Sequence, residues 1–505
     1  MSAAAQRTSS KHNVKTENGL ENHGSYEHGT IEEVVEKPFT IWTAMGLGHS
    51  ITNTAVGIIV GLANALPFGG PPVLFWGFIL MALMGCCIAI SLGELASALP
   101  HAGGQYFWVG KLGPRSCRRF LSYMVGLISW ASGLCVTASV DLIVAQIILG
   151  MVASAHPSFI VKPWITFIGY QLVNLLAFGF NFFERCLPWC SKALLIYTPS
   201  MIFAIFVSLL AGDSHKQSAS TFFVDLKNVS GWPAGVAFLI GFNPSAWSFS
   251  CLDSITHLAD EIPHPNKNIP KALLCTIAVG FVTGLPIVFA LMFSAPDLDT
   301  VVVAAVPSLE IFLQLHHSKA AAIALQSLVT ASAFGAIIGC HTWQSRMAWA
   351  FSRNHGFPFS RYLSQVAGAP FHAPIWSHVW SNVFIVILGC LYLASDLAFN
   401  SLVAGGLLFQ YISYIACIAC LLYHGRSNIA PGPFWFPKLG YVANILTLAW
   451  CLTALVFFSF PYYTPVAADE MNYVTVVLGA LVVFGIICWF SVGRRSYQLA
   501  DAGIN

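Results

Sequence analysis

Three acidic residues interrupt long apolar stretches of this sequence: Glu94, Asp141 and Asp253. An ionised side chain at the depth of a bilayer core costs about 2.5 kcal/mol or more, so such residues are kept where they have a role. Asp253 is interpreted as a group that binds a cation, carries a proton or braces a gate. Asp141 fits a gate and a structural hydrogen bond equally well. Glu94 is expected to form an ion pair with Arg346 or Arg353.

Two of the apolar stretches carry clusters of glycine and small polar residues in their middles. Glycine is a poor helix former, and a proline removes one backbone donor and clashes one turn back. Both segments are therefore predicted to unwind, and exposed carbonyls and half-helix N-termini at such breaks attract cations and carboxylates respectively. Close helix packing by small residues is the alternative interpretation. The clusters are Gly46, Gly48, Ser50, Thr52, Asn53, Thr54 and Gly57, and Gly241, Asn243, Pro244, Ser245, Ser248, Ser250 and Asp253.

Aromatic and histidine side chains extend this candidate site. A quaternary ammonium group has no proton to donate, so a site for one needs aromatic faces, each contributing roughly 0.5 to 2 kcal/mol. The candidates are Trp247, Phe249, Trp343 and Trp130, and packing or contact with lipid is the alternative for each. His341 is a candidate for binding substrate or a proton, with a buried neutral ring as its alternative.

The elements that position these residues follow from composition. Of the 505 residues, 56% are apolar and only 9% are charged, against roughly 25% charged in soluble domains. A helix needs about 20 apolar residues to cross a bilayer. The sequence contains twelve such stretches, which excludes a soluble enzyme. They cover residues 40–66, 73–98, 120–152, 164–183, 192–211, 234–257, 271–294, 320–350, 374–394, 397–422, 438–460 and 472–492.

The basic residues predict the orientation of these spans. Most Lys and Arg residues in the loops fall on the face that also holds both termini, and basic loops stay in the cytosol. The N- and C-termini are therefore predicted to be cytosolic. Residues 1–37 lack apolar periodicity and are expected to form a disordered cytosolic tail, and 494–505 form a short second tail.

The two polar clusters lie five spans apart. Because five is odd, the second copy has the opposite orientation, which predicts an inverted repeat. The expected domains are a first five-helix repeat (38–212), a second repeat (213–423, including an extracellular loop at 213–232) and two peripheral helices (424–493).

Several motifs resemble the amino acid, polyamine and organocation transporter superfamily over about residues 38–495. The stretches GELASALPHAGGQYFWVGKLGP (93–114) and SRMAWAFSRNHGFPFSR (345–361) are similar to its two cytosolic signatures. NPSAWSFSCLDSITHLADEIPHP (243–265), CHTWQSRMAWAFSRNHGFP (340–358) and PVAADEMNYVTVV (465–477) resemble its fungal amino acid and choline transporter branch, choline permeases above all.

The resemblance implies an all-α membrane protein of the leucine-transporter type, with a 5+5 inverted repeat and two extra helices. It implies alternating access without ATP, and no phosphate-binding loop motif is present. It also implies that substrate lies between the breaks of the first and sixth spans. The resulting substrate-binding set is Thr52, Asn53, Thr54, Gly57, Trp247, Ser248, Phe249, Ser250, Asp253, His341 and Trp343, with Glu94, Asp141 and Asp253 as gating or coupling candidates.

One departure concerns the first break. Choline permeases tend to carry TNSW there, whereas this chain has TNTA, with Ala55 in place of tryptophan. A choline-like amine, GABA, a polyamine, an amino acid and a specialised-metabolite amine therefore all remain candidate substrates, driven by a proton or by the membrane potential.

Two other classes of protein fit the sequence less well. A ligand sensor that does not transport is disfavoured by the short tails. An enzyme is disfavoured because neither an HExxH nor a GxSxG motif is present. No cofactor, metal or nucleic-acid partner is expected, and the plasma membrane is the expected location.

Overall fold

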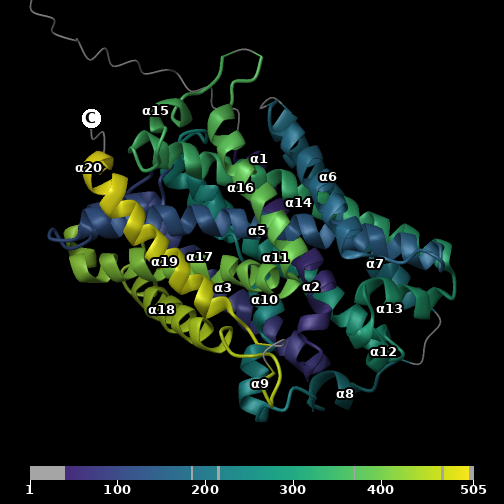
Figure 1. The fold of residues 1–505 in the computed structure, drawn as a ribbon. Coiled ribbons are helices and arrows are strands. Elements are labelled where there is room, and N and C mark those ends of the chain that lie inside the picture. The colour runs from purple at the N-terminus through teal and green to yellow at the C-terminus, as the bar shows by residue number, and fades with distance from the viewer. Residues whose placement is uncertain (1–39, 184–185, 213–215, 369, 468–470, 500–505) are drawn as a thin grey trace, which may run out of the picture. The chain divides into compact units, whose positions relative to one another are not determined.

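The computed structural model describes residues 40–183, 186–212, 216–368, 370–467 and 471–499. The predicted tail at 1–37 lies outside the described residues. Twelve helical stretches within the described chain are long and apolar enough to cross a membrane, as predicted. Figure 1 shows these helices and the short ones that connect them.

Most spans are single helices. They are α3 (Pro71–Ala98), α5 (Arg118–Ala155), α6 (Pro163–Phe180), α7 (Cys186–Ala211), α11 (Pro265–Ser294), α14 (Lys319–Arg353), α16 (Ile375–Ala394), α17 (Asp396–His424) and α18 (Leu439–Phe457). The helices α7 and α11 begin about one to two turns earlier than the spans predicted from hydropathy. Both starts contain polar residues that a window of apolar residues leaves out.

The first, sixth and twelfth spans are divided. The first comprises α1 (Ile41–Thr52), α2 (Thr54–Gly61) and η1 (Leu62–Asn64). The sixth comprises α9 (Ala234–Ile240), α10 (Asn243–Ser248) and η2 (Leu252–Leu258). The twelfth comprises α19 (Val474–Cys488), η4 (Trp489–Gly493) and α20 (Arg494–Ser496).

Local sequence explains where several spans begin. The Thr40 hydroxyl accepts from the Thr43 backbone N–H, and Thr43 returns a bond to the Thr40 N–H, which forms a capping box at the start of α1. Ser318 and Ser395 cap α14 and α17 through their hydroxyl oxygens. Prolines occupy the first turn of α3, α6 and α11, where a missing N–H costs nothing.

Helices at corresponding positions of the two predicted repeats pack in pairs. The second and seventh spans, α3 and α11, pack against each other, and so do the third and eighth, α5 and α14. The last two spans lie outside these pairs: α18 packs on α3 and α17, and α19 packs on α17 and α5 (Figure 1). The division into two repeats and two peripheral helices stays a prediction.

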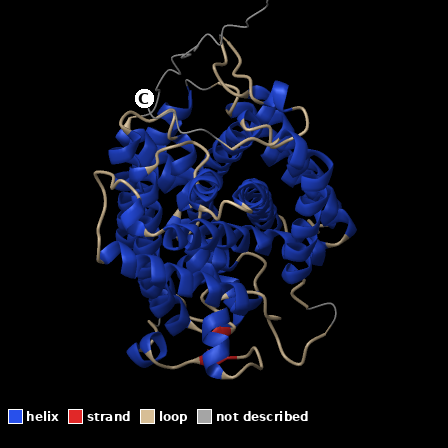
Figure 2. Cartoon of the chain, turned by 90° about the vertical axis from the view of Figure 1, so that its left-hand side faces the viewer, coloured by secondary structure: helices blue, strands red, loops and turns tan. Residues whose placement is uncertain are grey.

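The connections hold short elements that hydropathy did not reveal. The segment between α11 and α14 forms α12 (Leu298–Val303) and α13 (Pro307–His316). Two short strands, β1 (Phe68–Gly69) and β2 (Lys227–Asn228), pair antiparallel near one end of the molecule (Figure 2). The remaining short helices are α4 (Gln105–Leu112), α8 (Ala219–Phe223), α15 (Ser360–Leu363) and η3 (Arg426–Asn428).

Candidate functional site between two helix breaks

Asn53 forms the break in the first span. Its backbone is left-handed, with φ 39° and ψ 51°, so α1 ends there and α2 starts anew. A left-handed conformation is uncommon for residues other than glycine, although asparagine tolerates it better than most. The Asn53 N–H still donates to the carbonyl of His49 at 2.8 Å, so the chain turns without losing that bond. The predicted interruption is confirmed at this residue.

The Asn53 side chain connects this break to two other spans. Its amide nitrogen donates to the Ser332 carbonyl oxygen at 3.1 Å and lies 3.2 Å from the Ser332 hydroxyl oxygen. The Ser332 hydroxyl also lies 2.9 Å from the hydroxyl of Thr198. Because a carbonyl only accepts hydrogen bonds, the orientation of the Asn53 amide is fixed. The first, fifth and eighth spans therefore meet in one buried hydrogen-bonded node.

Cys251 forms the equivalent break in the sixth span. Its backbone is left-handed, with φ 62°, and separates α10 from η2. The freed Cys251 N–H donates to Oε1 of Gln410 at 3.0 Å, and the Gln410 amide lies 3.3 Å from the Cys251 sulfur. A side chain of the tenth span thus satisfies a backbone donor that the break leaves without a helical partner.

Asp253 follows this break and is 1% exposed. Its Oδ1 accepts a hydrogen bond of 2.7 Å from the hydroxyl of Tyr414, one turn beyond Gln410 on α17. Its Oδ2 lies 3.8 Å from Nε2 of His257. The His257 ring is held from its other side, since Nδ1 lies 2.8 Å from the Ala102 carbonyl oxygen. The carboxylate therefore lies between a phenol and an imidazole, without an arginine or lysine partner among the described residues.

The other polar residues of the predicted set have different surroundings. Thr52 and Thr54 are buried, and neither hydroxyl has a hydrogen-bond partner among the described residues. Ser250 bonds back to the Trp247 carbonyl at 2.7 Å. Gly57 lies against Ser248, where an added Cβ would come within 2.8 Å of the serine hydroxyl, so these two residues form the close contact of α2 with α10.

The aromatic candidates also differ in their surroundings. Trp247 is half-buried beside the break in the sixth span. Phe249 packs into the interface of the second span, with its ring centroid 5.0 Å from that of Phe78. Trp130 donates to the Ser381 hydroxyl and packs against phenylalanines, and Trp343 is buried with an indole N–H that lacks a partner among the described residues. Trp247 is the candidate placed next to a break with part of its surface free.

His341 and Asp141 are both fully buried. The His341 Nδ1 lies 3.0 Å from the amide of Gln344, and its ring packs edge-on against His378 at 5.5 Å between centroids. Both carboxylate oxygens of Asp141 lack a hydrogen-bond partner among the described residues. Their assignment to substrate binding or gating stays a prediction.

The partner predicted for Glu94 was wrong. Glu94 forms a bidentate ion pair with Arg426, at 2.7 and 3.0 Å, and also accepts from the Phe436 N–H at 2.7 Å. The arginines expected to pair with it have other partners: Arg346 contacts Glu261 at 3.0 Å, and Arg353 contacts Asp260 at 2.6 Å. Glu94 therefore anchors the loop between the tenth and eleventh spans, which sequence spacing alone could not indicate.

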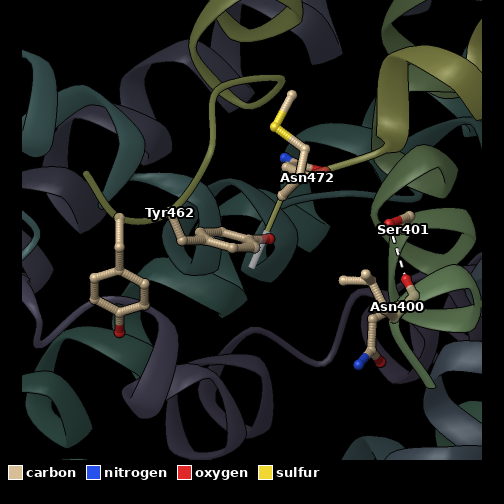
Figure 3. A pocket seen from close by; sticks show the side chains of 7 residues that line it. Asn400, Ser401, Tyr462 and Asn472 are labelled. Atoms are coloured by element: carbon tan, nitrogen blue, oxygen red, sulfur yellow. Dashed lines mark hydrogen bonds between the residues drawn. The ribbon is translucent and has the colours of Figure 1, made fainter. Parts of the chain in front are cut away.

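A separate cavity of about 240 Å³ lies at the start of α17, at the end of this helix opposite Arg426. Figure 3 shows Tyr462, Asn472, Ser401 and Asn400 around it. None of the predicted site residues lines it. Its lining residues are Leu397, Asn400, Ser401, Tyr462, Tyr463, Met471 and Asn472.

Sequence reasoning did not single out Gln410 and Tyr414. Their polar groups occur four residues apart within an apolar span, a spacing that places both on one helix face. That pattern was the available signal for a contact with the second break. No group of three His, Cys, Asp or Glu residues that could hold a metal ion occurs in the described part of the chain.

Two broken spans beside a buried carboxylate, among twelve candidate spans in the described residues, are features typical of membrane transport proteins. A family model described as amino acid permease matches residues 39–482, and the chain belongs to this family.

Three similar proteins carry the names of transporters or permeases. The chain is 44% identical over 481 residues to the swainsonine transporter of Arthroderma benhamiae, covering 95% of both proteins. It is 40% identical over 478 residues to the choline transporter of Saccharomyces cerevisiae, covering 93% of this chain and 84% of the relative. A GABA-specific permease of the same yeast is 27% identical over 495 residues, covering 93% and 84%.

Proposed function

We propose that the protein is a secondary active transporter of a small, hydroxylated organic cation, which binds between the breaks at Asn53 and Cys251. The observation that carries the proposal is the Asp253 carboxylate beside the second break. Glu94, Asp260 and Glu261 each have an arginine partner, whereas Asp253 has none among the described residues. A buried carboxylate without a cationic partner favours a cationic ligand.

Neighbouring groups support the same class of substrate. Trp247 offers an aromatic face next to the break, which favours an ammonium group that is rich in methyl or methylene carbons. The hydroxyl of Thr52 lacks a partner among the described residues at the first break, where it can bond to a hydroxyl group of the ligand. Choline and swainsonine, the compounds named for two relatives, are both amines that carry at least one hydroxyl.

Ala55 favours substrates of this class that are larger than choline. It is 1% exposed and stands where choline permeases tend to carry tryptophan, so one aromatic wall is replaced by a methyl group. We infer that the site accepts a specialised-metabolite amine larger than choline at least as well as choline itself. Zwitterions such as GABA are the second choice, because Asp253 would repel their carboxylate.

The break residues are closed off from solvent in this structure. Thr52, Asn53, Ser250 and Asp253 are 5%, 4%, 6% and 1% exposed. The ion pairs Arg346–Glu261 and Arg353–Asp260 join α14 to the segment after η2, on the side proposed to face the cytosol. Alternating access would require these contacts to separate on one side. We place the protein in the plasma membrane with both termini in the cytosol.

The test is uptake and efflux in yeast that lacks its own choline permease. Cells expressing the chain are given radiolabelled choline, swainsonine, GABA, a polyamine and a basic amino acid, with and without a protonophore. Saturable transport of choline or swainsonine in excess of GABA supports the proposal. Transport of GABA or an amino acid alone, or ligand binding without any transport, contradicts it.

A further inference from the structure

The side chains of Asp253 and His257 lie close together without a hydrogen bond between them. The atoms Oδ2 of Asp253 and Nε2 of His257 are 3.8 Å apart, and each is buried with no hydrogen-bond partner among the described residues. Buried polar atoms are nearly always satisfied, so two orphans that face each other indicate a group that joins them.

The tautomer of His257 follows from its other contact. Nδ1 lies 2.8 Å from the Ala102 carbonyl oxygen, which can only accept, so Nδ1 carries the hydrogen. In a neutral ring Nε2 is then an acceptor without a hydrogen, 3.8 Å from a carboxylate oxygen. Two acceptors repel each other, whereas one added proton makes Nε2 a donor and completes a charged pair with Asp253.

The segment that holds the ring is closely fitted. Gly104 has φ 52°, and a Cβ added there would lie 2.9 Å from the Thr256 hydroxyl and 3.0 Å from the His257 ring. The absence of a side chain at Gly104 lets this segment approach η2. The ring is therefore held from one side, with Nε2 3.8 Å from Oδ2 of Asp253.

The other ionisable groups around this pair leave it without a compensating charge. Arg346 and Arg353 from α14 are engaged by Glu261 and Asp260, and Glu94 from α3 is engaged by Arg426. Lys267 and Lys271 on α11 are exposed, and the Tyr414 hydroxyl donates to the other oxygen of Asp253. The remaining titratable residues on or beside the elements that contact this pair are His49, Cys86, Cys87, His101, Cys251, Cys275, Lys319, Cys340, His341, Tyr411, Cys417, Cys420, Tyr423 and His424.

We propose that Asp253 and His257 bind one proton in competition with the organic cation, so that the protein exchanges a proton for its substrate. Without the proton the pair carries one negative charge and attracts a cation. With the proton the pair is neutral and the cation loses its electrostatic partner. One proton enters the site as one cation leaves, so charge is conserved in each exchange. This inference rests on the function proposed above for the cation site.

The experiment measures choline and swainsonine binding to the purified full-length protein at about pH 7.5, 6.5 and 5.5. The expected result for the wild type is a dissociation constant that rises on acidification, by up to about tenfold per pH unit. In weakly buffered solution near pH 6, adding the bound amine should release protons. A dissociation constant independent of pH, with no proton release, overturns the inference.

Two variants distinguish the loss of proton binding from damage to the fold. In His257→Asn the amide nitrogen can replace Nδ1 as donor to Ala102, but nothing replaces Nε2. The expected result is amine binding that no longer depends on pH over this range, with no proton release. In Asp253→Asn, cation binding should fall at every pH. If His257→Asn keeps the wild-type pH profile, the proton is bound elsewhere and the inference is wrong.

Binding and proton uptake can fail independently. If neither amine binds at about pH 7.5, the proposed substrate class is wrong. Proton binding by the pair is then tested through melting temperatures measured without ligand. A titrating pair predicts that the difference in melting temperature between wild type and His257→Asn changes between about pH 8 and 5. A difference that stays constant contradicts the proton site itself.

Discussion

The side-chain amide of Asn53 donates to the carbonyl oxygen of Ser332 at 3.1 Å, across 279 residues of sequence. This bond joins the point where the first span unwinds to the middle of the eighth span. Asn53 therefore has two roles. Its left-handed backbone interrupts the helix, and its side chain bonds this interruption to the eighth span.

Substitutions of Asn53 should separate these two roles. Asn53→Gly keeps the left-handed backbone and loses the amide bonds, which are worth about 1 to 3 kcal/mol when buried partners are left unsatisfied. Asn53→Ala loses the same bonds and adds roughly 1 to 2 kcal/mol of left-handed strain. Melting temperatures should therefore fall in the order wild type, Asn53→Gly, Asn53→Ala. Equal losses for both variants would show that backbone strain does not matter here.

Loss of Arg426 should destabilise the protein strongly. Arg426→Ala leaves the Glu94 carboxylate, whose side chain is 0% exposed, without its cation, at a cost of about 3 to 5 kcal/mol. The double variant Glu94→Gln/Arg426→Met removes both charges and keeps an acceptor for the Phe436 N–H. It should be milder than Arg426→Ala alone. Thermal unfolding in detergent compares the two, and a double variant as unstable as Arg426→Ala would argue against the charge explanation.

His101 should make stability depend on pH. Burial lowers the pKa of His101 to about 4, and its Nδ1 accepts from the Gly103 N–H, which a protonated ring cannot allow. The unfolded ring takes up its proton near pH 6.5, so stability falls as the pH drops from about 6.5 to 4 and is constant above that window. The full loss is up to about 3 kcal/mol. Melting curves of wild type and His101→Gln should converge toward acidic pH, and parallel curves would contradict this.

Trp247 should set the preference for cations. Trp247→Ala removes an interaction of about 0.5 to 2 kcal/mol with an ammonium group, which raises the half-saturation for choline or swainsonine roughly 2- to 30-fold. The half-saturation for a zwitterion should change much less. Trp164, which is 55% exposed, gives a matched control as Trp164→Phe. Equal effects of Trp247→Ala on both classes would contradict an aromatic contact with the cation.

The spans and breaks were predictable because they depend on composition. Apolar length identified all twelve spans, and the glycine and polar clusters located unwinding at Asn53 and beside Cys251. The helices α12 and α13 were missed because their segments are too short and too polar for a hydropathy window.

Side-chain partners were less predictable because they join distant segments. Glu94 and Arg426 are 332 residues apart, and several arginines on the same predicted face were equally plausible partners. The orientation of the Phe249 ring was also not predictable. Sequence spacing places Phe249 beside the break but does not show which neighbour its ring contacts. Gln410 and Tyr414 carried a usable signal, because polar side chains at helical spacing in an apolar span require a buried partner.

The most direct test of a cation site beside Asp253 compares choline with its uncharged analogue 3,3-dimethylbutanol, which has the same shape. Both compete with a radiolabelled ligand for binding to wild-type and Asp253→Asn protein at about pH 7.5. The expected result is that choline competes at least about tenfold better on the wild type and loses this advantage in the variant. Equal competition by both compounds on the wild type, or an unchanged advantage in Asp253→Asn, would contradict a cation held by this carboxylate.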